Sequence, residues 1–312
     1  MTPCVLVTGG SGFIGTWVLR DLLDRNVSVV SLDSQSAPDR WKRLLGPRAG
    51  AIHEARASLL DRDQLRAVID QHGVTQIIHL AALLTPACQQ DPWLGCQVNV
   101  LGTTAVFDAA RLSGRIRSLS YASSFAVYGP EVVSNPEGDF SDRPRNRPPS
   151  FYGAFKQAAD LIAEQYWRHF GIASFAIRPH VVYGPERDQG LTAGPSLACR
   201  AAARGETYSI GYRGRVGYDY VKDVATAFVR GTFECPEGAT IVDLPGEQVS
   251  TDQFISTIES VFPETAGLIQ VSGPEIPANI PPDPQYISQV LTDWRTTSLV
   301  DGIRQTIEFY RG

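Results

Sequence analysis

Cys4-Val5-Leu6-Val7-Thr8-Gly9-Gly10-Ser11-Gly12-Phe13-Ile14-Gly15 opens this 312-residue chain and predicts how the rest of it folds. A short apolar run ends at a glycine cluster, and a helical pattern follows at once, as in a buried strand, a tight turn and a helix N-terminus. In such a turn Gly9 permits the sharp bend, Gly12 lets a pyrophosphate approach the backbone, and Gly15 lets the helix pack on the strand. Free N–H groups of the first helical turn, including those of Phe13 and Ile14, would then hold the phosphate. A plain glycine turn without a ligand is the alternative at this point.

A carboxylate follows the second predicted strand. Asp33 ends the run Val27–Asp33, about twenty residues after the glycine turn, where an acid can bind both ribose hydroxyls of an adenosine. The same charge would repel a 2′-phosphate, and Arg40 and Arg43 come only later, so NAD is favoured over NADP. A helix or turn cap is the alternative role for Asp33.

Composition narrows the classes of partner. With 43% hydrophobic residues the chain can bury a large core, and its net charge of −5 without a basic run argues against nucleic acid. The five cysteines are scattered without metal-ligand spacing, so we expect reduced thiols, no metal site and a cytoplasmic location. No apolar run approaches the ~20 residues of a membrane span, and no leader pattern is evident, so no membrane partner is expected.

Strand and helix patterns alternate as far as residue 178. This alternation predicts an α/β fold with a doubly wound parallel sheet of the Rossmann type over residues 1–178. After Pro179 glycines and prolines break the pattern, so residues 179–312 are expected to form mainly a smaller substrate-binding lobe. Segments near 216–245 are expected to return to the first domain.

Three side chains indicate the chemistry. Tyr152 and Lys156 are four residues apart near the start of a predicted helix, so they share a face. A lysine charge beside a phenol favours the phenolate and lowers the tyrosine pKa from about 10 toward neutrality, which suits an acid/base. Ser124 ends a neighbouring strand and could hold the same substrate oxygen. An exposed Tyr–Lys pair is the alternative. His79 is expected to be a buried strand histidine, while His180 is left open.

The chain resembles the extended short-chain dehydrogenase/reductase family, the NAD-dependent epimerase/dehydratase group. Matching motifs run along nearly the whole chain: Thr8–Gly15, Asp33, His79–Ala82, Asn99–Thr103, Ser123–Gly129, Tyr152–Lys156, Arg178–Pro185 and Thr297–Tyr310. The resemblance implies bound NAD, a catalytic Ser124, Tyr152 and Lys156, and a homodimer formed through helices near 95–111 and 152–168.

The resemblance also implies two sets of contacts. Besides the glycine turn, Asp33, Tyr152 and Lys156, it places at the cofactor Ser58, Leu59, Leu80, Ala81, Ala82, Asn99, Ala122, Pro179 and Val181. The residues expected at a small-molecule substrate are Leu83, Ser124, Phe125, Ala126, His180, Arg187 and Thr192; Arg187 and Thr192 come from the polar, glycine-rich stretch 187–196. Ser58 stands where the family usually has an aspartate that contacts the adenine amino group.

Departures from the family bear on the substrate. Phe125-Ala126 stand where the dehydratases carry an Asp-Glu pair, so elimination of water lacks its usual groups. Nucleotide-sugar members tend to carry asparagine at Val181, Arg-Asp at Val216-Gly217, and an arginine motif at 281–284. Those arginines grip a diphosphate, and Arg213 and Arg215 are possible substitutes.

The resulting prediction is an NAD-dependent epimerase or oxidoreductase of a sugar or nucleotide sugar. Tyr152 would take the proton of a secondary alcohol as hydride passes to NAD. If the keto compound is reduced again on its other face, the enzyme is an epimerase. If it leaves, the enzyme is a dehydrogenase or reductase of a non-nucleotide polyol, sugar acid or other small hydroxy or keto substrate. A non-catalytic NAD-binding protein is the remote alternative.

Overall fold

The computed structural model describes residues 3–116, 118–129, 148–234, 237–276 and 286–312. Within these residues seven parallel strands form the central sheet in the order β10-β6-β5-β4-β1-β2-β3. Their bounds are β1 Cys4–Thr8, β2 Ser28–Asp33, β3 Ile52–Arg56, β4 Gln76–His79, β5 Ser118–Ala122, β6 Ala173–Arg178 and β10 Ala239–Asp243. The order 3-2-1-4-5-6 confirms the predicted doubly wound Rossmann sheet.

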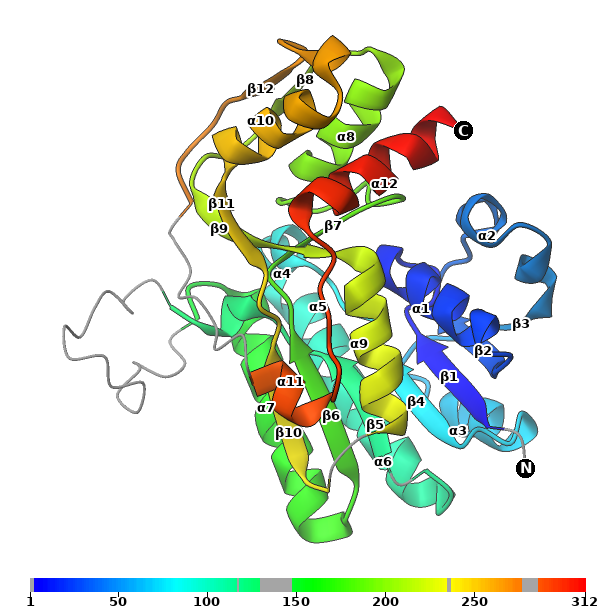
Figure 1. Ribbon diagram of the computed structural model, residues 1–312. Helices are drawn as coiled ribbons and strands as arrows, with labels where there is room; N and C mark the ends of the chain where they lie inside the picture. Colours follow the sequence, from blue (N-terminus) through cyan, green and yellow to red (C-terminus); the bar gives the residue numbers. More distant parts are fainter. Residues whose placement is uncertain (1–2, 117, 130–147, 235–236, 277–285) are drawn as a thin grey trace.

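Both faces of this sheet are buried, because side chains of a strand alternate between the two faces. Val5 and Val7 belong to one apolar cluster, while Cys4 and Leu6 belong to another. Helices α1 (Phe13–Asp24) and α9 (Val221–Phe233) pack together over the first face, and α3 (Arg62–Gln71), α6 (Gly102–Ser113) and α7 (Phe151–Phe170) cover the second (Figure 1). The continuous apolar runs seen in the sequence are therefore strands covered on both sides.

The strand order reverses beside β1, and this reversal positions the site. Thr8, the last residue of β1, pairs with Leu32 of β2 on one side and with His79 of β4 on the other. Ligands of open α/β sheets bind outside the carboxyl ends of the strands at such a reversal. The glycine turn that follows Thr8 lies at this point.

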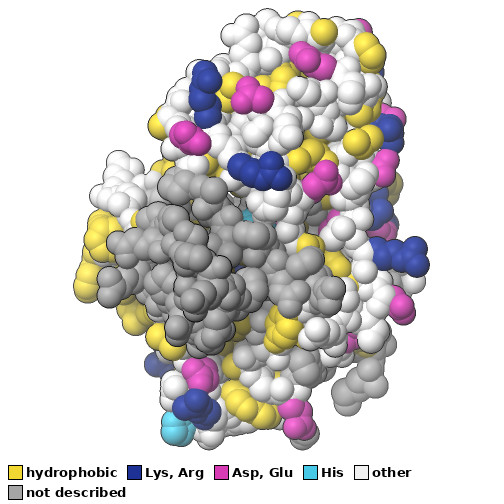
Figure 2. Space-filling model, turned by 60° about the vertical axis from the view of Figure 1, so that its left-hand side comes forward, with side chains coloured by type: hydrophobic (Ala, Val, Ile, Leu, Met, Phe, Trp, Pro, Cys, Tyr) yellow, Lys and Arg dark blue, Asp and Glu magenta, His cyan; other side chains and the backbone are white. Residues whose placement is uncertain are grey.

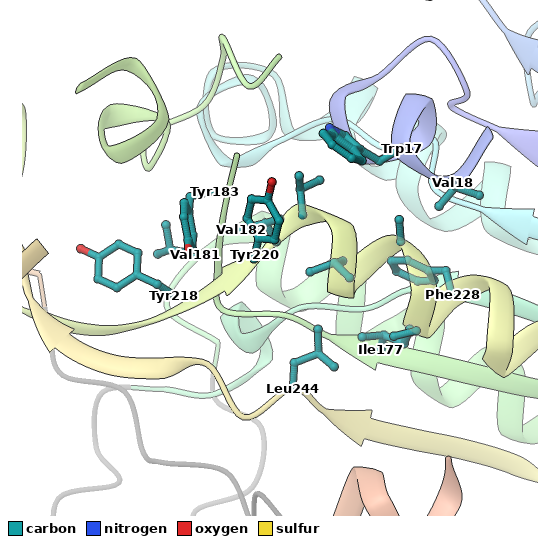
Figure 3. Packing of buried hydrophobic residues seen from close by; sticks show 14 of the residues in the cluster. Trp17, Val18, Ile177, Val181, Val182, Tyr183, Tyr218, Tyr220, Phe228 and Leu244 are labelled. Carbon is teal, nitrogen blue, oxygen red and sulfur yellow. The ribbon is translucent and has the colours of Figure 1, made fainter. Parts of the chain in front are cut away.

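The C-terminal part adds a smaller lobe above the strand ends (Figure 1). Strands β7 (Val181–Tyr183), β9 (Arg215–Tyr220) and β11 (Glu247–Ser250) form one sheet, and β8 (Tyr208–Ile210) pairs with β12 (Ile269–Val271). Helices α8 (Gly194–Arg204), α10 (Thr251–Val261) and α12 (Leu299–Arg311) pack against them. Tyr183, Tyr218 and Tyr220 continue the same apolar cluster that reaches Trp17 on α1 (Figure 3), so the lobe and the sheet share a core.

Two segments have a structure that their local sequence does not suggest. Residues 34–50 are polar and rich in turn-forming residues, yet they contain α2 (Pro38–Leu45) followed by a 3-10 turn η1 (Gly46–Ala51). The helix forms because Trp41 is buried and its Nε1 donates to the Gly10 carbonyl oxygen at 3.1 Å, a tertiary contact that outweighs a polar local sequence.

The second segment is a long helical stretch with an irregular turn inside it. Its helical pattern runs over residues 91–111, and the structure divides it into α5 (Pro92–Cys96), a π-helical turn η2 (Gln97–Leu101) and α6. Such π turns are rare and occur often at functional sites. The remaining elements are α4 (Thr85–Gln90), η3 (Phe125–Val127), η5 (Pro263–Thr265) and α11 (Tyr286–Val290).

Candidate active site

The glycine turn leaves room for a ligand and for no side chain. Gly9 has φ +75°, and a Cβ there would lie 2.7 Å from the Ala81 nitrogen; a Cβ on Gly15 would lie 2.1 Å from the Gly9 carbonyl oxygen. Gly12 is the N-cap of α1 and offers no side chain to cap the helix. The N–H groups of the first turn are thus available to an anion at the positive end of the helix dipole.

Asp33 ends β2 beside this turn. Its Oδ2 accepts a hydrogen bond from the Ser11 N–H at 3.2 Å, and its Oδ1 accepts one from Gln35 at 3.4 Å. Burial raises the pKa of this carboxyl, although these N–H groups oppose the change. A glycine cradle and a carboxylate at the end of the next strand fit the pyrophosphate and adenosine ribose of a dinucleotide.

Other residues expected at the cofactor follow the neighbouring strands β4 and β3, and they differ in how far they are exposed to solvent. Leu80, Ala81 and Ala82 follow β4 directly. Ser58 is exposed, and its hydroxyl accepts a hydrogen bond from the Leu60 N–H at 3.2 Å, while Leu59 is buried.

Asn99 holds the backbone of the segment that follows β4. Its Oδ1 accepts from the Leu83 N–H at 2.8 Å and its Nδ2 donates to the Leu83 carbonyl oxygen at 2.9 Å. The buried amide on the π turn therefore fixes the backbone after β4, including the expected substrate residue Leu83.

The structure brings Tyr152, Lys156 and Ser124 into one region of the molecule. Ser150 caps α7 by accepting from the Gly153 N–H at 3.1 Å, which starts the helix at Phe151 and places Tyr152 in its first turn. The Ser124 hydroxyl lies near enough to the Tyr152 phenol to lower its pKa. The Lys156 ammonium lies 5.7 Å from the centre of the Tyr152 ring.

Burial dominates the electrostatics of these groups. It raises the pKa of Tyr152, while the Ser124 hydrogen bond and the charge of Arg187 lower it in part. The prediction that Lys156 brings this phenol toward neutrality is therefore wrong for the protein alone. The Lys156 ammonium donates to the Ala122 carbonyl oxygen at 2.7 Å instead, and burial lowers its own pKa to about 8.

Arg187 and Thr192 lie in the segment after β7 and are joined to each other. Arg187 Nη2 donates to the Thr192 hydroxyl at 2.8 Å, and Nη1 donates to the Val182 carbonyl oxygen. The guanidinium lies 5.9 Å from the ring centre of Phe13 in the glycine turn. Burial lowers its pKa to about 10, and the charges of Arg187 and Tyr152 act on each other, so this segment borders both the turn and the tyrosine.

The two candidate histidines are neutral and differ in surroundings. His79 is buried on β4, as predicted, between the hydroxyls of Thr8 at 2.7 Å and Thr103 at 3.0 Å. His180 stacks on Phe125 with ring centres 3.6 Å apart, and its buried Nδ1 has no hydrogen-bond partner in the described part of the chain. Burial lowers the pKa of each histidine to about 3.

The positions expected to bear on a diphosphate are apolar. Val181 on β7 and Val216 on β9 are both buried in the shared core (Val181 is labelled in Figure 3). Arg213 is tied to the lobe, where its Nη2 donates to the Val271 carbonyl oxygen at 3.2 Å, and Arg215 is exposed at the start of β9. The departure at 281–284 lies outside the described residues.

Sequence reasoning missed a charged link across the cofactor turn. Arg40 of α2 donates to the Ser11 carbonyl oxygen at 2.6 Å and to Asp188 at 2.8 Å. Arg43 forms a bidentate pair with Glu186 at 2.9 and 2.7 Å. The pairs join positions more than 140 residues apart in sequence, so no local pattern predicts them.

Neither a metal site nor a membrane span emerges from the described ranges. They hold no group of three or more His, Cys, Asp or Glu side chains placed to bind a metal, and no helix there has the length and apolarity to cross a bilayer. On the face shown in Figure 2, basic and acidic side chains are interspersed and do not form a single-sign patch.

Known proteins resemble the chain along its length. The model of the NAD dependent epimerase/dehydratase family matches residues 5–234. The UDP-glucose 4-epimerase of Mycolicibacterium smegmatis is 30% identical over 321 aligned positions, which cover 98% of each protein. The structure of Thermus thermophilus UDP-glucose 4-epimerase, solved with NAD, is 26% identical, with a TM-score of 0.81 and 99% of each chain covered. The Thermotoga maritima UDP-glucose 4-epimerase structure, with UDP-glucose, has a TM-score of 0.84 at 22% identity over 99% of this chain and 98% of that one, a likeness of fold.

Proposed function

Because this chain belongs to the NAD dependent epimerase/dehydratase family, we propose that it is an NAD-dependent epimerase acting on a secondary alcohol of a sugar or nucleotide sugar. The observation that carries the proposal is the grouping of three side chains: the Ser124 hydroxyl acts on the pKa of the Tyr152 phenol, and the Lys156 ammonium lies 5.7 Å from the centre of the tyrosine ring. Two of the relatives named above, from Mycolicibacterium smegmatis and Thermus thermophilus, match nearly the whole chain and are UDP-glucose 4-epimerases.

Each of the three side chains has a distinct task. Tyr152, as the phenolate, accepts the proton of the substrate hydroxyl, and as the resulting phenol it returns that proton to the carbonyl oxygen. Ser124, whose hydroxyl acts on the same phenol, holds the substrate oxygen beside it. Lys156 supplies a fixed positive charge that favours the phenolate form, since its ammonium is anchored on the Ala122 carbonyl oxygen. NAD held in the glycine turn and by Asp33 supplies the hydride acceptor and a further positive charge.

The residues after Ser124 favour epimerisation over elimination of water. Phe125 is buried and its ring stacks on His180, and Ala126 carries no proton donor. A 4,6-dehydratase needs an acid and a base at these two positions, and neither side chain can replace them.

The apolar Val181 and Val216 support a second candidate, a dehydrogenase of a non-nucleotide polyol or sugar acid. A diphosphate needs donors or charges around it, and both valines are buried in the core. The two candidates share every step at Tyr152 and differ in whether the reduced cofactor leaves the protein with the keto product.

The test is an activity screen of the full chain with NAD. UDP-glucose, UDP-glucuronate and dTDP-glucose are compared with free sugars and sugar acids, with product analysis and absorbance near 340 nm. Conversion to the 4-epimer without net NADH supports the epimerase; steady NADH release with a free sugar or acid would replace it by the dehydrogenase. Tyr152→Phe should abolish turnover and keep NAD binding, while the remote Tyr208→Phe should preserve both. Turnover that survives Tyr152→Phe would refute the assigned role.

We also propose a homodimer formed through α5, α6 and α7. Large apolar side chains are exposed along these helices and the π turn η2 between α5 and α6: Trp93 73%, Leu94 43%, Leu101 53%, Leu161 54% and Phe170 53%. Apolar patches of this kind mark association surfaces. Leu161→Glu should yield monomers in sedimentation equilibrium, whereas Val300→Glu on α12, also exposed, should not; a monomeric wild type would overturn the dimer.

We also propose that the protein is located in the cytoplasm. The cysteines of the described residues, Cys4, Cys88, Cys96 and Cys199, are all unpaired thiols, which suits a reducing compartment.

A further inference from the structure

A buried carboxylate lies directly behind the lysine of the site. Asp160 is one helical turn after Lys156 on α7 and is 6% exposed. It accepts hydrogen bonds from the Tyr121 hydroxyl at 3.1 Å, from the Ser123 hydroxyl at 3.0 Å, and from Arg178 Nη2 and Nε at 2.6 and 3.2 Å. Both oxygens of this carboxylate thus accept hydrogen bonds from residues at the ends of two strands, one at Oδ1 and three at Oδ2.

These contacts converge on the residues that precede Ser124. The Lys156 ammonium holds the Ala122 carbonyl oxygen at 2.7 Å, and Asp160 holds the hydroxyl of the next residue, Ser123. Two side chains one turn apart on α7 therefore hold consecutive residues at the end of β5. Since Tyr152 begins the same helix, the distance between Tyr152 and Ser124 depends on this attachment.

A second layer of contacts holds the carboxylate in place. Arg178 at the end of β6 also donates to the Tyr128 hydroxyl at 2.7 Å, and that hydroxyl donates to Asp243 of β10 at 2.9 Å. The network thereby crosses β5, β6 and β10 at their carboxyl ends. A buried network in which all members are satisfied is rigid, whereas surface ion pairs add little.

We propose that Asp160 is a positioning residue of the active site, which fixes the end of β5 on α7 and keeps the Lys156 ammonium charged. The role rests on the proposed function of Tyr152, Ser124 and Lys156, and it concerns a residue that touches neither substrate nor cofactor. The hydrogen bonds of Asp160 support this role, because loss of the carboxylate would release the Ser123 hydroxyl and leave the Arg178 guanidinium without its main partner.

The charges around Lys156 support the second half of the role. Burial lowers the pKa of Lys156 to about 8, and the negative charge of Asp160 opposes this change. The other groups that face the ammonium are Cys88 of α4, neutral His79 of β4 and the phenol of Tyr152. Without the Asp160 charge, the pKa of Lys156 falls further and the lysine loses its proton at a lower pH.

The decisive experiment reads Lys156 directly and needs no substrate. The chain has three lysines, Lys42, Lys156 and Lys222, so carbon-13 labelling of the lysine Cε gives signals that Lys42→Arg and Lys222→Arg assign. In the wild type the Lys156 signal should titrate near pH 8. In Asp160→Asn we expect it to titrate about one pH unit lower, and kcat to fall at least about tenfold with its alkaline limb moved the same way.

Controls separate the possible outcomes. Glu164→Gln removes a carboxylate one turn further along α7 and should leave the titration and kcat unchanged, while Ser123→Ala should lower kcat without moving the titration. If Asp160→Asn does not fold, Asp160→Asn/Arg178→Gln removes both buried charges together and carries the same expectation. An unmoved Lys156 titration with wild-type kcat overturns the positioning role. A shifted titration in a protein without NAD-dependent turnover would instead overturn the proposed function alone.

Discussion

Lowering the pH from about 7 to about 4.5 should destabilise the protein through His79. Burial holds the pKa of this histidine at about 3, against 6.5 for the unperturbed side chain. Between these values the unfolded chain binds a proton at His79 and the folded chain does not. The stability contributed by the neutral ring is therefore complete above pH 6.5 and is lost as the pH falls toward 3.

The magnitude follows from the linkage relation. For one group with these two pKa values, the loss between pH 7 and pH 4.5 is about 2.5 kcal/mol, a large part of a typical unfolding free energy of roughly 5–15 kcal/mol. His79 is 4% exposed, so solvent screening does not reduce this figure. Its neutral form is also the one that bridges the Thr8 and Thr103 hydroxyls at 2.7 and 3.0 Å.

Urea unfolding at both pH values measures the effect. His79→Gln keeps a polar side chain between the threonines and removes the titration, so its unfolding free energy should fall about 2.5 kcal/mol less than that of the wild type. Val300→Gln, at an exposed position of α12, removes no titrating group and should retain the wild-type pH dependence. Equal losses in His79→Gln and wild type would refute the argument that this histidine stays neutral in the folded state.

Two glycine substitutions test the packing of the site and the lobe. Gly15→Ala places a Cβ 2.1 Å from the Gly9 carbonyl oxygen, so the turn must open and NAD affinity, measured by calorimetric titration, should drop at least about tenfold. Gly50→Ala, with nothing within 4 Å of the added Cβ, should bind NAD normally. Equal NAD affinities of the two variants would count against a cofactor site at the glycine turn. Gly302→Ala places a Cβ 2.0 Å from the Tyr183 hydroxyl in the core. The free energy of unfolding in urea should therefore fall by about 1–3 kcal/mol. An unchanged urea midpoint would contradict the close packing of α12 on β7.

Local patterns were sufficient to predict the sheet and the grouping of the three side chains proposed to be catalytic. The apolar run Cys4–Thr8 is a strand buried on both faces, and the glycine turn after it leads directly into helix α1. Tyr152 and Lys156 meet Ser124 because a capped helix start and a strand end are both local features. Such signals are contained within a few residues, so one sequence suffices to recognise them.

Electrostatics could not be read in the same way. The expected low pKa of Tyr152 came from spacing alone, whereas the observed direction depends on how deeply the phenol is buried. Asp160 was invisible for a similar reason, because its partners come from the ends of two strands. Desolvation and strand-end contacts are properties of the assembled fold.

The charged link between α2 and the segment after β7 shows how a tertiary contact changes the meaning of a local sequence. Glu186 has φ +73°, a left-handed conformation that a non-glycine residue adopts at a cost of about 1 kcal/mol or more. The backbone is held there by the Tyr310 hydroxyl, which accepts from the Glu186 N–H at 2.7 Å, and by the Arg43 pair. Glu186 and Asp188 thereby face α2, while Arg187 between them reaches Val182 and Thr192. One residue in a left-handed conformation therefore connects the helix beside the glycine turn to the segment that borders Tyr152, and the ion pairs of Arg40 and Arg43 join the two.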